Sequence, residues 1–98
     1  MKTLDILGYH YTVNETKPLS EMKGNSGTCD LDHSIIELAN DAGEDMKLST
    51  LLHEIIEAIN FHLEIRLTEA KIKQLEAGLF QALTTNGVNL QDLLYKDN

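Results

Sequence analysis

The sequence predicts an α+β fold, in which a short three-stranded N-terminal sheet packs on two long helices. Apolar and polar residues alternate in the first third of the chain, which is the period of a β-strand. From Leu48 onward, apolar residues recur every three or four positions, as in an amphipathic helix. The chain has 98 residues, enough to bury one modest core, so we expect a single domain over residues 1–98.

A β-hairpin is expected at the N-terminus. Residues 4–6 and 9–13 alternate apolar and polar side chains on either side of Gly8, which offers a turn. Tyr9 and Tyr11 share one strand face, where we expect core or sheet surface rather than catalysis. His10 faces the opposite way and should be exposed to solvent.

A loop and a third strand should follow the hairpin. Residues 14–29 are rich in Pro, Gly, Asn and Ser, which predicts a loop with one helical turn. Residues 33–38 predict the third strand, and residues 40–44 break it. Asp30, Asp32 and His33 form a polar cluster, which we interpret as an Asx-rich turn rather than a metal site.

Two long helices account for the second half of the chain. The first has an apolar stripe made of Leu48, Leu52, Ile55, Ile59 and Leu63, and either Asp45 or Ser49 could cap its start. Thr68 is the expected N-cap of the second helix, and the pair Asn86-Gly87 should end it. Its expected buried stripe is Ile72, Leu75, Leu79 and Leu83. Residues 89–95 predict a short C-terminal helix.

Composition indicates which classes of partner and which cellular compartment to expect. Eight basic residues against sixteen acidic ones give a formal charge of -8, which disfavours binding to nucleic acid and to anionic membranes. The charge does not exclude a protein partner with a basic face. Cys29 is the only cysteine, so no internal disulfide can form. No secretion signal or apolar run long enough to span a bilayer is visible, and we expect a cytoplasmic protein.

The first helix carries an H-E-x-x-E motif. His53 and Glu57 are four residues apart, so they lie on one helix face at the edge of the apolar stripe. Imidazole nitrogen and carboxylate oxygen are both ordinary zinc ligands. Glu54 occupies the position that holds the general base in zinc peptidases, where it takes a proton from water.

A catalytic zinc site needs a third protein ligand. His62 is about half a turn out of phase with the motif and should point away. The second helix offers Glu69 and Glu76. If the two helices pack antiparallel, Glu76 falls opposite Glu57, whereas Glu69 falls nearer the turn. His33 on the third strand is a weaker candidate.

The motif and its flanks resemble a known family. Thr50–Ile59, TLLHEIIEAI, is similar to the TLLHEIIHAI run of small phage- and prophage-encoded HExxH metallopeptidase-like proteins. The flanking segments that also fit are Gly8–Val13, Gly27–Leu38, Leu67–Ile72 and Leu75–Leu83. The resemblance implies a minimal zincin fold, in which an edge strand can hold an extended peptide above the helix that carries the metal.

The resemblance also implies roles for individual residues. More distantly, the chain is similar to bacterial metallopeptidases that cleave phage and mobile-element repressors, in which a carboxylate early in the second helix completes the site. Carried over, His53 is the first zinc ligand, Glu54 the general base and Glu69 the third ligand. Glu57 departs from the family because it stands where the second ligand histidine belongs. One histidine and two carboxylates should bind zinc less tightly than two histidines and one carboxylate, and suit a harder metal better.

Three functions are compatible with the sequence. The first is a zinc metallopeptidase-like protein that cleaves a protein or peptide by metal-activated water. The second is a catalytically diverged, acidic phage protein that binds and inhibits a host protein or defence factor. The third is a small assembly protein that oligomerises through an apolar patch. The sequence leaves the oligomeric state open.

Overall fold

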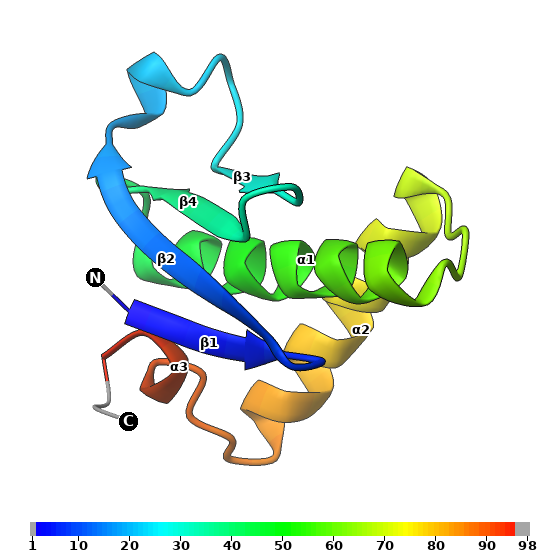
Figure 1. The fold of residues 1–98 in the computed structure, drawn as a ribbon. Coiled ribbons are helices and arrows are strands. Elements are labelled where there is room, and N and C mark those ends of the chain that lie inside the picture. The colour runs from blue at the N-terminus through cyan, green and yellow to red at the C-terminus, as the bar shows by residue number, and fades with distance from the viewer. Residues whose placement is uncertain (1, 96–98) are drawn as a thin grey trace.

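The computed structural model describes residues 2–95 and has the expected α+β fold (Figure 1). The strands are β1 (Lys2–Ile6), β2 (Tyr9–Lys17), β3 (Gly27–Asp30) and β4 (Ile35–Ala39). The helices are α1 (Glu44–Leu63), α2 (Glu69–Thr85) and α3 (Asp92–Tyr95), and a 3₁₀ turn, η1 (Leu19–Glu21), lies in the loop after β2. None of the helices in this range has an apolar stretch long enough to cross a membrane.

The sheet has four strands in the order β1-β2-β4-β3, so the prediction of three strands was wrong. β2 is antiparallel to β1 and parallel to β4, and β4 is antiparallel to β3. The missed strand, β3, has only four residues and follows a segment rich in Gly and Asn. Its extended form depends on pairing with β4, from Gly27 with Leu38 to Asp30 with Ile35, and sequence spacing does not reveal such pairing.

The predicted hairpin is confirmed. Leu7 and Gly8 connect β1 to β2, and both have left-handed backbone angles, with φ of 55° and 87°. Such a pair matches the twist of a two-residue hairpin turn. Asp5 accepts a hydrogen bond from the Gly8 amide at 2.8 Å, which stabilises the turn.

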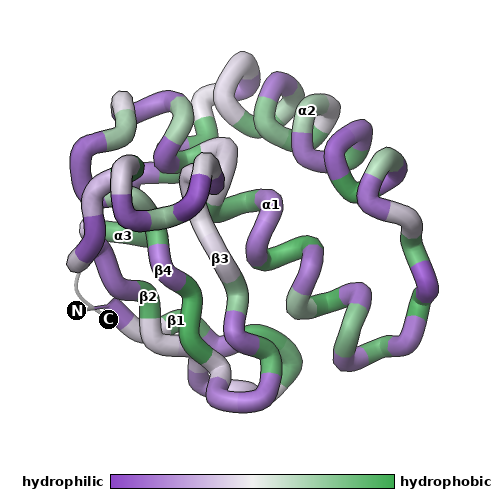
Figure 2. Tube along the Cα trace, turned by 90° about the horizontal axis from the view of Figure 1, so that it is seen from above, coloured by the Kyte–Doolittle hydropathy of each residue, from purple (hydrophilic) through white to green (hydrophobic). Residues whose placement is uncertain are grey.

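α1 lies between the sheet and α2 (Figures 1 and 2). The main core joins the inner face of the sheet to α1 and to the C-terminal segment, and its buried members are Ile6, Tyr11, Val13, Ile36, Leu38, Leu48, Leu51, Ala58, Leu90 and Leu94. Alternate positions point to the outer face, where His10 is exposed as expected. One face of the sheet is therefore packed and the other is polar.

The ends of α1 differ in part from the prediction. Gly43 is the N-cap and makes no side-chain hydrogen bond, so neither Asp45 nor Ser49 caps this helix. Glu44 and Asp45 lie in the first turn instead, where their charge favours the helix dipole. The helix ends at Leu63 because Glu64 turns into the left-handed region, with φ of 54°.

The start and end of α2 are as predicted, but its apolar stripe is only partly buried. Thr68 caps the start by accepting a hydrogen bond from the Lys71 amide at 3.3 Å, and the helix stops before Gly87. Ile72 is 1% exposed, whereas Leu75 and Leu79 are 43% and 41% exposed. α2 packs mainly on α1, so a narrow strip of its surface is covered.

A small second core joins α2 to α1 and consists of Leu52, Ile56 and Ile72. Leu63, expected in the α1 stripe, lies beyond this contact and is 56% exposed. α3 covers Asp92–Tyr95, and is shorter than the helix expected over residues 89–95 because residues 89–91 form the turn before it.

Candidate metal centre

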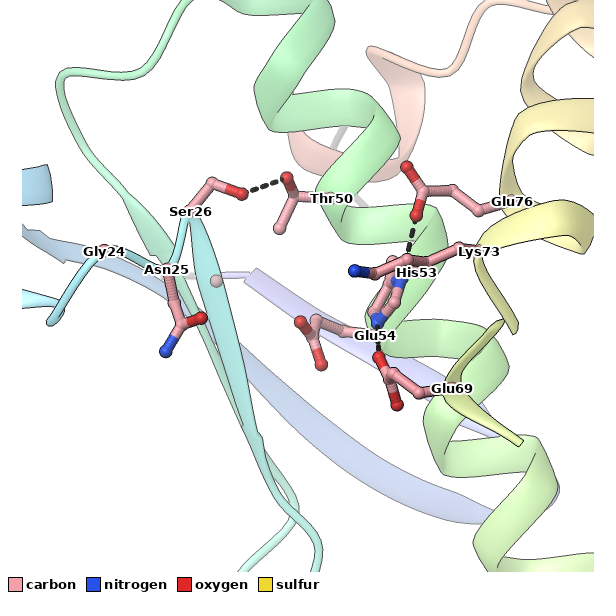
Figure 3. Close-up of a pocket in the computed structure, with 10 residues that line it drawn as sticks. Gly24, Asn25, Ser26, Thr50, His53, Glu54, Glu69, Lys73 and Glu76 are labelled. Carbon is pink, nitrogen blue, oxygen red and sulfur yellow. Dashed lines mark hydrogen bonds and ion pairs between the residues drawn. The ribbon is translucent and has the colours of Figure 1, made fainter. Parts of the chain in front are cut away.

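His53 lies between two carboxylates of α2 (Figure 3). Its Nε2 is 2.9 Å from Oε1 of Glu69, and its Nδ1 is 2.8 Å from Oε1 of Glu76. Ionised carboxylates only accept hydrogen bonds, so this arrangement requires a proton on each ring nitrogen. Burial lowers the pKa of His53, but the Glu76 hydrogen bond and the surrounding glutamate charges outweigh it and raise the pKa overall.

Glu57 completes a cluster that could hold a cation. One ligand atom from each of His53, Glu57 and Glu69 lies within 4.8 Å of the others. Ligands around a tetrahedral zinc ion lie about 3.4 Å apart, given metal–ligand distances of about 2.1 Å. Modest rotation of the two glutamate side chains would reach that spacing, so the donor set fits a divalent ion. Burial and the charge of Glu69 raise the pKa of Glu57.

Glu76 contacts the opposite ring nitrogen from Glu69. It also accepts a hydrogen bond from the hydroxyl of Ser49, one turn before His53 on α1. Helix spacing alone had placed Glu76 opposite Glu57, so the actual position of α2 differs from that expectation. The structure thus separates the two candidates of α2, with Glu69 beside Glu57 and Glu76 behind the imidazole.

Glu54 is buried in the same region, with only 6% of its surface exposed. Burial raises its pKa to about 7, and the charges of Glu57, Glu69 and Glu76 contribute in the same direction, whereas His53 opposes them. A carboxyl group with a pKa near neutrality can both accept and donate a proton at physiological pH, which is what a general acid–base group requires.

These side chains open into a pocket of about 440 Å³. His53, Glu54, Glu69 and Glu76 line it from the helices. β3 and the loop before it supply the other wall, through residues 24–27, and Ser26 hydrogen bonds to Thr50 at 2.7 Å. No motif in residues 24–27 indicated this role, because it depends on β3 being the edge strand next to α1.

His62 and His33 both lie away from the site. For His62 this agrees with the expectation from helix spacing. Nε2 of His62 is 2.6 Å from the hydroxyl of Tyr11, and its ring stacks on Tyr9 at 3.8 Å. His33 lies in the turn between β3 and β4, where its Nδ1 is 3.0 Å from Asp30. His33, the weaker candidate for third ligand, therefore belongs to an exposed turn.

Cys29 is close to the site but is not a reactive thiol. Burial, together with the charges of Glu54 and Glu57, raises its pKa to about 12. The thiolate is the nucleophilic form of cysteine, and it is scarce at physiological pH when the pKa is this high.

No family model, curated protein or solved structure matches this chain. The resemblance to phage-encoded HExxH proteins therefore stays a hypothesis. The geometry and electrostatics of the cluster around His53 are the features that bear on function.

Proposed function

We propose that this protein is a zinc metallopeptidase-like protein of the minimal zincin type, encoded by a phage or prophage and acting in the bacterial cytoplasm. The supporting observation is the convergence of His53, Glu57 and Glu69 within 4.8 Å, beside a buried Glu54. Two of the ligands come from α1 and the third from α2, so the proposed site exists only when the helices pack together.

Each residue has a defined role in this proposal. His53, Glu57 and Glu69 would hold the ion, which would supply Lewis acidity for water and for a peptide carbonyl. Glu54 takes the proton from water and later gives it to the departing amine. Glu76 accepts a hydrogen bond from Nδ1 of His53, so Nε2, which now contacts Glu69, would be the ring nitrogen offered to the ion.

The proposed substrate is an extended segment of a protein. β3 is an edge strand of the sheet, and Gly27 lines the pocket that contains His53. An edge strand can add a further strand through backbone hydrogen bonds. A peptide paired with β3 would then pass the site with its backbone close to Glu54.

The first test is elemental analysis of protein purified without an affinity tag and without chelator. We expect about one equivalent of zinc, lost in His53→Ala and retained in His33→Ala, which removes an exposed histidine outside the cluster. Glu54→Gln should keep the metal and abolish hydrolysis of a protein substrate. Metal-free protein whose stability does not change in His53→Ala would refute the proposal.

A second candidate is a diverged, acidic protein that binds and inhibits a host protein. An apolar hollow of about 250 Å³ supports it, lined by Leu4, Ile6, Leu7, Ile55 and Ile59 among others and sharing no residue with the pocket around His53. The charge of -8 would favour a partner with a basic rim. Salt-sensitive capture of one host protein, undiminished in Glu54→Gln, would favour this candidate over the peptidase.

A further inference from the structure

Lys73 supplies a positive charge to a pocket that three glutamates line. It lies four residues after Glu69 and three before Glu76, so all three share one face of α2. It lines the same pocket as His53, and Figure 3 shows its side chain extending from α2 past the imidazole into that space.

The ammonium group of Lys73 makes no ion pair or hydrogen bond with any of residues 2–95, although Glu69 is at the favourable i,i+4 spacing. By contrast, Nζ of Lys47 pairs with Glu15 at 2.7 Å. Glu69 and Glu76 bind the two nitrogens of His53 instead. The two carboxylates of α2 near Lys73 are therefore already bonded to His53. The ammonium group of Lys73 is available to a negatively charged atom of a ligand.

We propose that Lys73 binds the carbonyl oxygen of the scissile peptide bond and stabilises the negative charge that develops on it. This inference rests on the proposed function. When the water oxygen bonds to the carbonyl carbon, the π electrons move to the carbonyl oxygen, and the proton released by water goes to Glu54. Lys73 donates a hydrogen bond to that oxygen without losing its proton. The electrons then return, the C–N bond breaks, and the amine takes the proton from Glu54.

The charge distribution supports this role over a purely structural one. Glu54, Glu69 and Glu76 would repel an oxyanion, so the pocket needs a compensating donor in addition to the ion. A hydrogen bond between an ammonium group and an anionic oxygen is among the stronger ones in proteins. Removing one such donor typically weakens binding about 10- to 100-fold.

Inorganic phosphate, a small tetrahedral anion, is a suitable probe for calorimetric titration of the zinc-loaded protein. We expect Lys73→Met to weaken phosphate binding at least about tenfold, whereas Lys73→Arg retains most of it. Lys71→Met is the matched control, because Lys71 is an exposed lysine of the same helix that does not line the pocket. Zinc affinity, measured by chelator competition, should not fall in Lys73→Met.

The outcomes separate this inference from the proposed function. Equal losses in Lys73→Met and Lys71→Met would show an effect of net charge alone and overturn the role of Lys73. Zinc uptake with phosphate affinity unchanged in Lys73→Met, or with no phosphate binding by the unmodified protein, would also overturn it while leaving the metal site standing. Failure to bind zinc through His53 would overturn both.

Discussion

Glu57 changes the charge of the site more than its geometry. Its spacing from His53 suits a shared ion as well as a histidine would, and the structure brings it close to Glu69. With Glu54 nearby, however, several carboxylates surround one imidazole, and the pKa values of Glu54 and Glu57 are both raised. Metal binding must displace any proton carried by the ligands, among them His53 and Glu57, so zinc affinity should rise with pH.

Glu54 should make the metal-free protein less stable as the pH rises. Its pKa is about 7 in the folded protein and near 4.5 when unfolded, so between these values the folded state binds more protons and the free energy of unfolding falls as pH increases. The full penalty, at most about 3 kcal/mol, is present above pH 7 and absent below pH 4.5. Glu54→Gln, which stays neutral, should therefore be stabilising at pH 8.

Thermal denaturation with chelator present tests this expectation. The melting temperature of Glu54→Gln should exceed that of the unmodified protein at pH 8, and the two should converge near pH 4.5. If the two melting temperatures differed by the same amount at pH 8 and at pH 4.5, the effect would come from the shape of the substituted side chain and not from the ionisation of Glu54. Glu37→Gln is a control, because Glu37 bonds to Thr16 on the exposed side of the sheet.

At the scale of elements, the position of β3 against α1 depends on Gly27. A Cβ at this residue would overlap Cγ2 of Thr50 and lie 3.2 Å from the carbonyl oxygen of Glu37. The edge strand can therefore approach the helix only without a side chain at this point. The same close approach forms one wall of the pocket around Glu54.

Gly27→Ala should consequently destabilise the protein by about 1–3 kcal/mol, measured by urea denaturation. Gly78→Ala should have the opposite sign and stabilise it by about 0.5–1 kcal/mol, because Gly78 lies inside α2 and a Cβ added there would meet open space. Adding Thr50→Ser, which removes the overlapping methyl group but keeps the hydroxyl, should restore part of the loss in Gly27→Ala. Equal effects of the two alanine substitutions would contradict this account of β3.

At the scale of the whole molecule, the proposed site joins two layers that share little of their cores. The main core fixes α1 on the sheet and is contacted by Phe80 and Leu83 near the end of α2, whereas the first half of α2 is attached through Ile72, which packs on Leu52 and Ile56. Glu69 and Glu76 belong to α2, so the geometry around His53 depends on this smaller contact. Local opening of α2 would disperse the cluster without unfolding the sheet.

Ile72→Ala should lower the free energy of unfolding by about 2–4 kcal/mol and weaken zinc binding as well. Leu75→Ala, on the exposed side of the same helix, should change both by much less. Denaturation and chelator competition measure the two effects. Normal zinc affinity in a destabilised Ile72→Ala protein would show that the ligands do not need the packed position of α2.

Local patterns were sufficient for several features of the fold. The alternation around Gly8 predicted the β1–β2 hairpin, and the 3.6-residue period predicted both long helices. Thr68 marked the start of α2 because a side-chain cap acts within one turn. The phase of α1 also showed that His62 points away from His53, which the bond to Tyr11 confirms.

By itself, the sequence determined the α+β class, the helices and the spacing of His53, Glu54 and Glu57 on one of them, since all of these depend on contacts within a few residues. The tertiary structure decided the rest. It paired β3 with β4, left Leu75 exposed, and placed Glu69 and Glu76 on opposite nitrogens of His53. These outcomes depend on how one element packs against another. The periodicity of a sequence reports local structure and does not reveal the packing of elements that are far apart in the chain.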